Sequence, residues 1–462
     1  MSQIAYSRTM SDAEGLMWRL EKDPHLSSTF ANVTILDRKP DFAKLRRRME
    51  RVVVRIPRLR QRVQTVPGYV SAPVWVDDPD FDLDIHLRRI ALPKPGTERQ
   101  LLDLATLITA DPFDRMRPLW QFVIVEGLKG NRAALIEKLH HTITDGEGGV
   151  QLSLEFLDFE RDVPDLPIPT QDEIELANES IDQGQPDSMR DFVAGTLRIP
   201  LGIVRQIKDL LADPGQIPDA SSAAADTFRG IVNQLGDSDK ARSPLWTERS
   251  LRRHLEVASA PFTETRASAR KLGGTLNTAF MTVAAEAAAS YHSELGSPVE
   301  SLKASMAIST RTDDSGSNAF SLVRMLVPTG DIPIDERFRA IHESSLAAVG
   351  QSKSANLETI AAFASALPTS IVTRLARQQA QTIDFATSNV KGAPIAMYAA
   401  GAQLLHNYPV GPLGGVAFNL TLLSYLGNLD MGMNTDTAAV SEPALMKRCL
   451  DRAITDFLAI AG

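Results

Sequence analysis

Residues 121–146 read QFVIVEGLKGNRAALIEKLHHTITDG, and this stretch decides how the chain folds around its most reactive side chains. Residues 121–128 form an apolar run with the composition of a strand, and residues 133–139 form a second such run. The cluster KGNR at 129–132 is typical of a tight turn between two strands. The stretch therefore predicts two successive strands, with a pair of histidines where the second strand ends and a loop begins.

The histidine pair, His140 and His141, is followed in the same loop by Asp145 and Gly146. Histidine has an ordinary pKa of about 6.5, so its neutral form is well populated at physiological pH and can accept a proton. Transfer of an acyl group from a thioester to an alcohol needs such a base and a donor for the developing oxyanion. On spacing alone, a histidine pair without any role explains the pattern almost as well.

Other chemistries find less support in the sequence. Adjacent histidines point to opposite faces of a strand, and the remaining histidines are scattered, so a shared metal ion is not expected. The chain contains no HExxH motif, no cysteine–histidine cluster, no GxSxG elbow, no P-loop and no dinucleotide-binding fingerprint. We therefore expect neither a metal nor a resident cofactor.

Composition sets the broad class of the chain. Its 462 residues are 43% hydrophobic and 23% charged, which is typical of a globular protein large enough for two domains. The formal net charge of −8 argues against a nucleic-acid partner. The single cysteine excludes an internal disulfide, and neither a secretory signal nor a membrane-spanning stretch is evident. We expect a cytoplasmic protein, which can still lie on a membrane surface.

Three regions differ in composition. Residues 1–160 mix helical and strand periods, whereas residues 161–245 are rich in proline and acidic side chains, as in a solvated connection with amphipathic helices. Residues 246–462 are again typical of a globular domain. The predicted fold class is therefore α/β in layered α+β form, with two mixed halves joined by a long crossover.

Several local elements are expected within these regions. The crossover contains an apolar stretch with basic side chains at 197–208, and a strand-rich part at 382–436 precedes the closing helix from 442. The periodicity also predicts helices at 41–52, 151–159, 276–292 and 335–349, and strands at 303–309 and 320–328.

Residues 140–146 match the HHxxxDG motif of the chloramphenicol acetyltransferase-like superfamily, which includes condensation domains of non-ribosomal peptide synthesis. The surrounding residues resemble the bacterial wax ester synthase/diacylglycerol acyltransferase family more specifically. Three segments of the first half resemble its opening, its Pro-x-(Phe/Leu)-Arg-x-Arg stretch and its PLWE run: residues 10–14, 56–62 and 118–121. Three segments of the second half resemble SNVPG, PVGPL and LNITLLSY: residues 388–392, 408–413 and 419–425.

The resemblance implies two chloramphenicol acetyltransferase-like domains with the active site in a channel between them. Acyl-CoA would enter from one side, and diacylglycerol or a long-chain alcohol from the other, to give triacylglycerol or a wax ester without an acyl-enzyme. It makes His141 the general base, accompanied by His140, and makes Asp145 a structural residue paired to an arginine such as Arg60 or Arg62. Peripheral contact with a membrane or lipid droplet is compatible with these substrates.

The same resemblance assigns substrate-binding roles to Trp120, Gly146, Asn277, Ser388 and Asn389. The chain departs from the family pattern at three positions. Thr278 stands in place of the aspartate that follows the asparagine in the family, Gln121 in place of glutamate and Lys391 in place of proline. A cap of the Ala-rich helix is an equally good interpretation of Asn277.

Two other functions remain open. Another HHxxxDG transferase, of the condensation or polyketide-associated type, would use a carrier-bound donor or a different acceptor, although the C-terminal matches argue against it. A non-catalytic lipid-binding relative would keep the channel without turnover. The sequence does not rank diacylglycerol against a fatty alcohol, because the shape of the channel sorts these acceptors.

Overall fold

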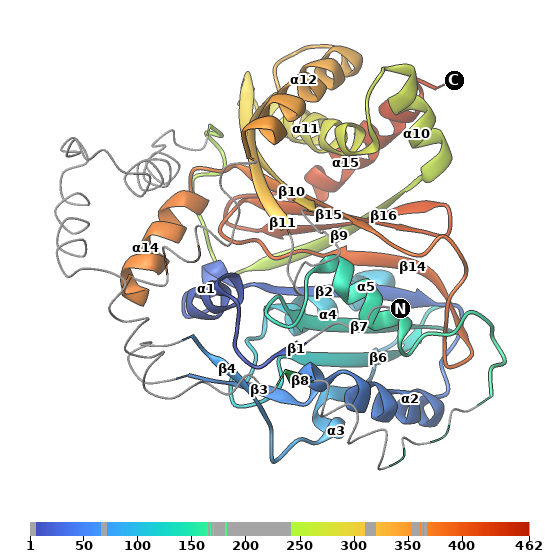
Figure 1. Cartoon of the computed structure of the whole chain (residues 1–462). Coiled ribbons are helices and arrows are strands. Elements are labelled where there is room, and N and C mark those ends of the chain that lie inside the picture. The colour runs from blue at the N-terminus through green and yellow to red at the C-terminus, as the bar shows by residue number, and fades with distance from the viewer. Residues whose placement is uncertain are drawn as a thin grey trace.

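The fold is seen in a computed structural model of the chain, which describes residues 6–65, 72–164, 242–309, 320–352 and 367–461, with short pieces at 167, 170, 181–182, 361 and 364. The predicted stretch 197–208 and most of the crossover lie outside these residues. Figure 1 shows two mixed α/β halves, one above the other, each built on its own sheet. The predicted α/β class with two layered halves is thus confirmed.

The sheet of the N-terminal half is centred on the strand pair that the sequence predicts. The antiparallel strands β6 (Trp120–Leu128) and β7 (Arg132–His140) are joined by a turn in which Gly130 and Asn131 have positive φ angles of 85° and 57°. Glycine and asparagine tolerate this left-handed conformation, so the turn residues suit a tight reversal. The order of this sheet is β13 (Tyr398–Ala399), β14 (Ala402–Val410), β2 (Thr29–Leu36), β7 (Arg132–His140), β6 (Trp120–Leu128) and β5 (Leu87–Ala91).

Helices of the N-terminal half begin at recognisable caps. Ser11 and Glu14 form a capping box at the start of α1 (Asp12–Leu20). Leu45, Met49 and Val52 bury one face of α2 (Phe42–Arg55), as the periodicity predicted. The elements are α1 (Asp12–Leu20), α2 (Phe42–Arg55), α3 (Leu83–His86), α4 (Glu98–Ala110) and α5 (Gly146–Leu154), the 3-10 turns Pro24–Leu26 and Pro57–Leu59, and the strand pairs β3 (Gln61–Gln64) with β4 (Val74–Asp77) and β1 (Tyr6–Ser7) with β8 (Ile181–Asp182).

The C-terminal half has a second mixed sheet with helices packed on one face (Figure 1). Its order is β11 (Phe320–Pro328), β10 (Ser301–Ser309), β12 (Phe385–Lys391), β15 (Phe418–Tyr425), β16 (Asn428–Asp436) and β9 (Arg253–Pro261). Its helices are α10 (Phe262–Lys271), α11 (Leu276–Glu294), α12 (Ile334–Ser352), α14 (Thr369–Ala380) and α15 (Pro443–Leu458). The predicted strands and the helices of this half are therefore confirmed.

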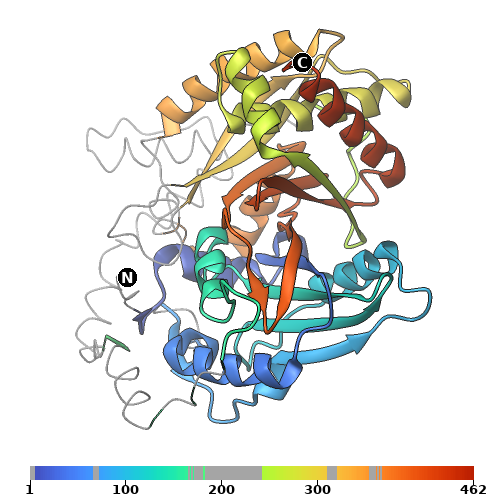
Figure 2. The same ribbon diagram turned by 90° about the vertical axis from the view of Figure 1, so that its right-hand side faces the viewer.

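The two halves share a strand. β14 belongs by sequence to the C-terminal half, yet it pairs antiparallel with β2, so that Val410 lies opposite Ala31 and Leu404 opposite Leu36. Figure 2 shows this orange segment reaching from the upper half into the lower sheet. The division at residue 160 stays a prediction, but the N-terminal sheet also contains residues 398–410.

Buried apolar side chains form one large cluster in each half and a third cluster between them. In the third cluster, Leu101 and Leu102 of α4 pack against Ile136 of the lower sheet and Leu255 of β9. This packing fixes the two halves relative to one another. None of the described helices is both long and apolar enough to span a bilayer.

Two local expectations need correction. The helix predicted for 151–159 begins earlier, at Gly146, and ends at Leu154, because the Asp145 side chain caps its first turn. The Ala-rich helix α11 is capped by Thr275, whose hydroxyl accepts the N–H of Thr278, so the cap is not Asn277.

Candidate active site

The end of β7 sends successive side chains to opposite faces of the sheet. Glu137, Leu139 and His141 line a large cavity between the two halves, whereas His140 lines a smaller cavity on the other side. This alternation is the period of two that an extended strand imposes. The two adjacent histidines therefore have separate environments.

Both ring nitrogens of His140 form hydrogen bonds. Its Nδ1 accepts the backbone N–H of Thr142 at 3.1 Å, so the ring hydrogen of its neutral form lies on Nε2, which donates to Glu21 at 3.1 Å. Burial alone would raise the pKa of Glu21, but hydrogen bonds from His140, Ser27 and the backbone of Ser28 lower it. His140 is 1% exposed, which suits it to hold the loop rather than to meet a substrate.

His141 is half-buried and faces the large cavity. Its ring lies against Phe30, with the two ring centroids 4.6 Å apart, and its backbone N–H donates to the carbonyl of Ser28. Burial lowers the pKa of His141 to about 4, and His140 acts in the same direction, while Asp145 opposes them. The imidazole is therefore neutral at physiological pH and can accept a proton.

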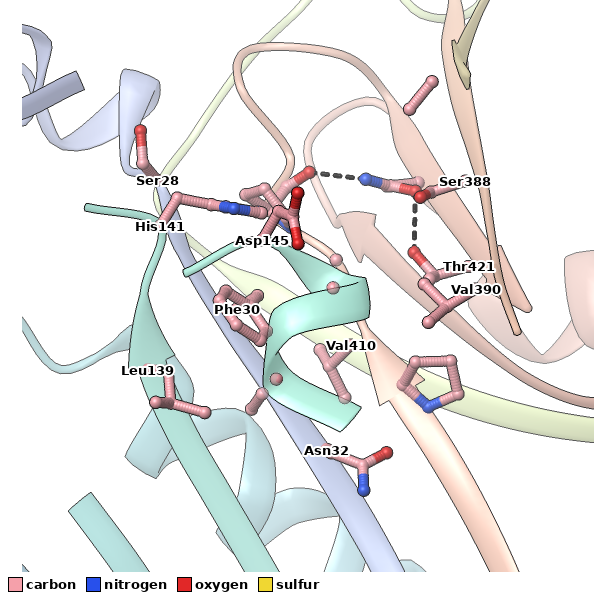
Figure 3. A pocket seen from close by; sticks show the side chains of 18 of the residues that line it. Ser28, Phe30, Asn32, Leu139, His141, Asp145, Ser388, Val390, Val410 and Thr421 are labelled. Carbon is pink, nitrogen blue, oxygen red and sulfur yellow. Dashed lines mark hydrogen bonds between the residues drawn. The ribbon is translucent and has the colours of Figure 1, made fainter. Parts of the chain in front are cut away.

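The large cavity has a volume of about 520 Å³ and lies between the two halves. Figure 3 shows His141 and Asp145 on one wall, with Ser388 and Thr421 contributed by the C-terminal half. Most of its lining is apolar, which suits an aliphatic chain. The apolar lining includes Leu16, Met17, Leu20, Phe30, Leu139, Val150, Leu154, Leu157, Ala376, Ile383, Val390, Leu404, Val410, Leu413 and Leu423.

The loop after His141 is shaped by a helix cap. The Asp145 carboxylate accepts the backbone N–H of Gly148 at 2.8 Å, which starts α5 directly behind the histidine. A Cβ at Gly148 would lie 1.9 Å from the Thr144 hydroxyl, and one at Gly146 would lie 2.9 Å from Val390. These close approaches explain why glycines follow the aspartate.

Arg60, one of the two arginines named as partners of Asp145, has other contacts. Arg60 donates to the carbonyl oxygens of Val53 and Val54 at 2.9 Å and lies 4.0 Å from Asp77. The pairing of Asp145 with Arg60 or Arg62 stays a prediction. The capping bond already gives Asp145 a role in holding the loop.

The structure places the predicted substrate-binding residues unequally. Ser388, Asn389 and Gly146 line the large cavity. Asn277 is exposed and outside the lining, and its amide oxygen accepts a hydrogen bond from Asn389. Trp120 is buried in the N-terminal core, where its indole N–H donates to the Leu59 carbonyl at 2.7 Å and its ring stacks on His86. Trp120 lines neither cavity, and its substrate-binding role stays a prediction.

The smaller cavity, of about 330 Å³, adjoins the large one and shares part of its wall. Val410 and Leu413 line both cavities. The smaller cavity has two arginines in its lining, Arg115 and Arg253, whereas the larger one has a single arginine, Arg324. Within the described residues, no group of three or more histidine, cysteine or acidic side chains is arranged to hold a metal ion.

Comparison with known sequences connects this geometry to a family. Residues 10–280 match the model of the wax ester synthase/diacylglycerol acyltransferase catalytic domain, and residues 316–457 match the C-terminal domain of the same family. The chain belongs to the wax ester synthase/diacylglycerol acyltransferase family. It is therefore an acyltransferase, as the resemblance of its motifs implied.

Relatives of this family member are similar over nearly their whole length. A putative diacylglycerol O-acyltransferase of Mycobacterium tuberculosis is 32% identical, in an alignment covering 100% of this chain and 95% of the relative. A probable diacylglycerol O-acyltransferase of the same species is 28% identical, with 87% of this chain and 85% of the relative covered.

Solved structures share the fold of this acyltransferase. The wax ester synthase/diacylglycerol acyltransferase from Marinobacter aquaeolei VT8 has a TM-score of 0.68 at 21% identity, with 98% of this chain and 99% of that chain covered. The first condensation domain of the calcium-dependent antibiotic synthetase has a TM-score of 0.60 at 14% identity, covering 98% and 96%. The two-domain chloramphenicol acetyltransferase-like fold is thus confirmed.

The three residues that depart from the family pattern, Gln121, Thr278 and Lys391, lie outside the lining of the large cavity. Thr278 is buried in α11, with its hydroxyl 3.0 Å from a ring nitrogen of His342. Lys391 is exposed at the end of β12, and Gln121 lies opposite Lys138 in the N-terminal sheet.

The sequence did not single out several residues of the site. Glu21 is far from His140 in the chain, and nothing in its surroundings marks it as a partner. Phe30 is one apolar residue among several in its strand, and no pattern in the sequence relates it to His141. Glu137 had a visible signal, since this acidic residue stands in a mainly apolar strand and shares the strand face of His141.

Proposed function

We propose that the enzyme transfers a long-chain acyl group from acyl-CoA to the hydroxyl of diacylglycerol or of a long-chain alcohol, with His141 as general base. The observation that supports this most strongly is the position of His141, a neutral imidazole on the wall of a largely apolar cavity of about 520 Å³. The names of the relatives, diacylglycerol O-acyltransferases, favour diacylglycerol as an acceptor.

In the proposed reaction, His141 removes the proton from the acceptor hydroxyl as that oxygen attacks the thioester carbonyl. The tetrahedral intermediate then collapses, the bond between carbon and sulfur breaks, and the ester forms without an acyl-enzyme. Protonated His141 returns its proton to the sulfur of the departing CoA. Because burial disfavours the imidazolium, this second transfer is favourable.

Neighbouring residues position this base and the substrate. His140, bonded to Glu21 and Thr142, fixes the end of β7, and Asp145 fixes the start of α5. Ser388 and Asn389 offer polar groups to the substrate from the opposite wall of the cavity. Asn277 acts through its hydrogen bond with Asn389, and Gly146 keeps the loop close to Val390.

The two cavities suggest how donor and acceptor approach. We assign aliphatic chains to the large cavity, because most of its lining is apolar. The smaller cavity contains Arg115 and Arg253, so it suits the anionic groups of CoA. Such an arrangement keeps water away from the apolar side of the site.

The remaining properties follow from these substrates. We propose that the enzyme acts in the cytoplasm, in peripheral contact with a membrane or a lipid droplet, where its acceptor and product collect. It needs no metal, resident cofactor or nucleic acid. Its domains would comprise residues 1–160 and 246–462, joined by the crossover 161–245.

A CoA-release assay tests this function. Palmitoyl-CoA is supplied with diacylglycerol, with hexadecanol or with no acceptor, and acceptor-dependent release is expected from the native enzyme. Binding of palmitoyl-CoA without any release would favour a lipid-binding role. Turnover only with an acyl group on a carrier protein would favour a condensation-type transferase.

A further inference from the structure

A group of polar side chains interrupts the apolar wall of the large cavity. We define the Glu137 cluster as the four lining residues Asn32, Glu137, Ser153 and Asn407. In Figure 3, Asn32 lies at the opposite end of the drawn pocket from His141, with Phe30 and Val410 between them. The catalytic role of His141 makes no use of this cluster.

Hydrogen bonds join the Glu137 cluster to three elements. The Glu137 carboxyl accepts from the Asn32 amide on β2 and from the Ser153 hydroxyl on α5, each at 3.0 Å. The Asn32 amide nitrogen also contacts the side-chain oxygen of Asn407 on β14, and the Thr34 hydroxyl donates to that same oxygen at 2.7 Å. The cluster is therefore rigidly placed.

Glu137 is 5% exposed, and no described lysine or arginine forms an ion pair with it. Burial raises the pKa of Glu137, which favours the neutral carboxyl, a group that can both donate and accept a hydrogen bond. An apolar side chain of similar volume would be cheaper to bury in a cavity that holds aliphatic chains. A carboxyl here is explained if the bound lipid itself has a polar group at this depth.

The hydrogen-bonding capacity of the cluster indicates which polar group fits. The Asn32 nitrogen faces the oxygens of Thr34, Glu137 and Asn407, which fixes the orientation of the amide. The amide oxygen has no donor among the described residues, but it is almost fully buried, so a ligand meets the cluster through the side chains of Glu137, Ser153 and Asn407 that line the cavity. An ester carbonyl only accepts hydrogen bonds, whereas a hydroxyl both donates and accepts, so a hydroxyl complements the cluster.

The strand sets the distance between this cluster and the reacting group. Glu137 and His141 are four residues apart on the same face, which corresponds to about 13 Å along an extended chain. Resting on the proposed function, we propose that the Glu137 cluster is a subsite for a hydroxyl group in the middle of a long aliphatic chain, carried by the acyl donor or by the acceptor.

Paired lipids test this subsite. Ricinoleoyl and oleoyl chains differ by one mid-chain hydroxyl. Equilibrium binding of ricinoleoyl-CoA against oleoyl-CoA, and of ricinoleyl alcohol against oleyl alcohol, is measured by calorimetry. The two arms distinguish donor from acceptor, and they do not depend on turnover, so a failure of the proposed transferase activity in the CoA-release assay remains separate from a failure of the subsite.

The expected result is a binding preference of about tenfold for the hydroxylated chain in one arm, as a well-placed hydrogen bond gives. Glu137→Met should abolish this preference or reverse it, and Glu137→Gln should keep most of it. Asn32→Leu, on another strand, is a second variant if Glu137→Met does not fold. Leu135→Met, in the same strand but outside the cavity lining, is the matched control and should keep the native preference.

A structural role of Glu137 predicts something different. If the carboxyl only ties α5 to β7, its loss would weaken binding of both members of each pair equally, and the ratio would not change. Equal binding of hydroxylated and plain chains by the native enzyme in both arms would overturn the proposal. So would a ratio that Glu137→Met leaves within twofold of the native one.

Discussion

The two faces of the end of β7 differ although their residues alternate along one short stretch. On one face, His141 meets an apolar cavity that joins the two halves, and its pKa is lowered to about 4. On the other face, His140 is held by Glu21 and Thr142 at its two ring nitrogens. Two identical side chains thus acquire different properties because the strand turns them to different neighbours. The first suits proton transfer and the second suits positioning.

The sharpest test of this comparison is His141→Ala. We expect acyl transfer to fall by about 10²–10⁴-fold, because a general base in the transition state contributes that much. The melting temperature should stay close to the native value, since the imidazole lines a cavity. Leu135→Met, in the same strand but outside the cavity lining, should keep activity. A variant His141→Ala with full CoA release would remove His141 from the mechanism.

His140→Ala should show the opposite balance. Removing this ring takes one hydrogen-bond donor from Glu21 and leaves the buried Thr142 without its ring partner, which costs about 1–3 kcal/mol of unfolding free energy. We expect a smaller loss of activity than for His141→Ala. Denaturant unfolding measures the first effect and CoA release the second.

The contribution of Glu21 is separable by a double-mutant cycle with Glu21→Gln. If His140 acts through Glu21, the two changes together should destabilise the protein less than the sum of the single changes. Strict additivity of the two unfolding free energies would show that the bond between Nε2 and the carboxylate is unimportant.

Asp145 should affect stability through its helix cap. Asp145→Ala removes the acceptor for the Gly148 N–H and is expected to cost about 1 kcal/mol, which thermal unfolding would detect. Asp145→Asn preserves an oxygen acceptor and should change stability by only a few tenths of that. An equal loss in both variants would mean that the negative charge, rather than the cap, is what the loop needs.

The smallest expected effect concerns pH. A base with a pKa of about 4 stays neutral until the pH falls to that region, so kcat/KM should remain constant as the pH is lowered from 8 to about 5. Activity should then fall as His141 takes up a proton. A decline centred near the ordinary histidine value of about 6.5 would show that His141 is not shifted in the free enzyme.

Local patterns predicted much of the fold. Alternating and apolar runs placed β6 and β7, and the helical period placed α2 and α11, since these signals lie in contiguous residues. The start of α5 was missed because glycine has a low helix propensity, whereas the Asp145 cap dominates locally. The pairing of β14 with β2 could not be predicted, because no local sequence pattern indicates which distant strands pair.

The site was predicted in part for the same reason. The motif and the strand period placed His141 at a strand end, and the family resemblance brought Ser388 and Asn389 to the same cavity. The buried position of Trp120 was not predictable, because a sequence match does not tell whether a nearby aromatic ring faces a substrate or the core. The Glu137 cluster joins β2, β7, α5 and β14, so only the three-dimensional structure shows it.

The position of β14 has a consequence for how the protein is made. During synthesis, β2 emerges early and keeps one edge unpaired until residues 402–410 have left the ribosome. An unpaired edge strand is a template for association with other chains, and pairing across such a long loop is slow. The newborn N-terminal half is thus open to aggregation until nearly the whole chain has been translated, and a fragment ending near residue 160 would keep that edge permanently.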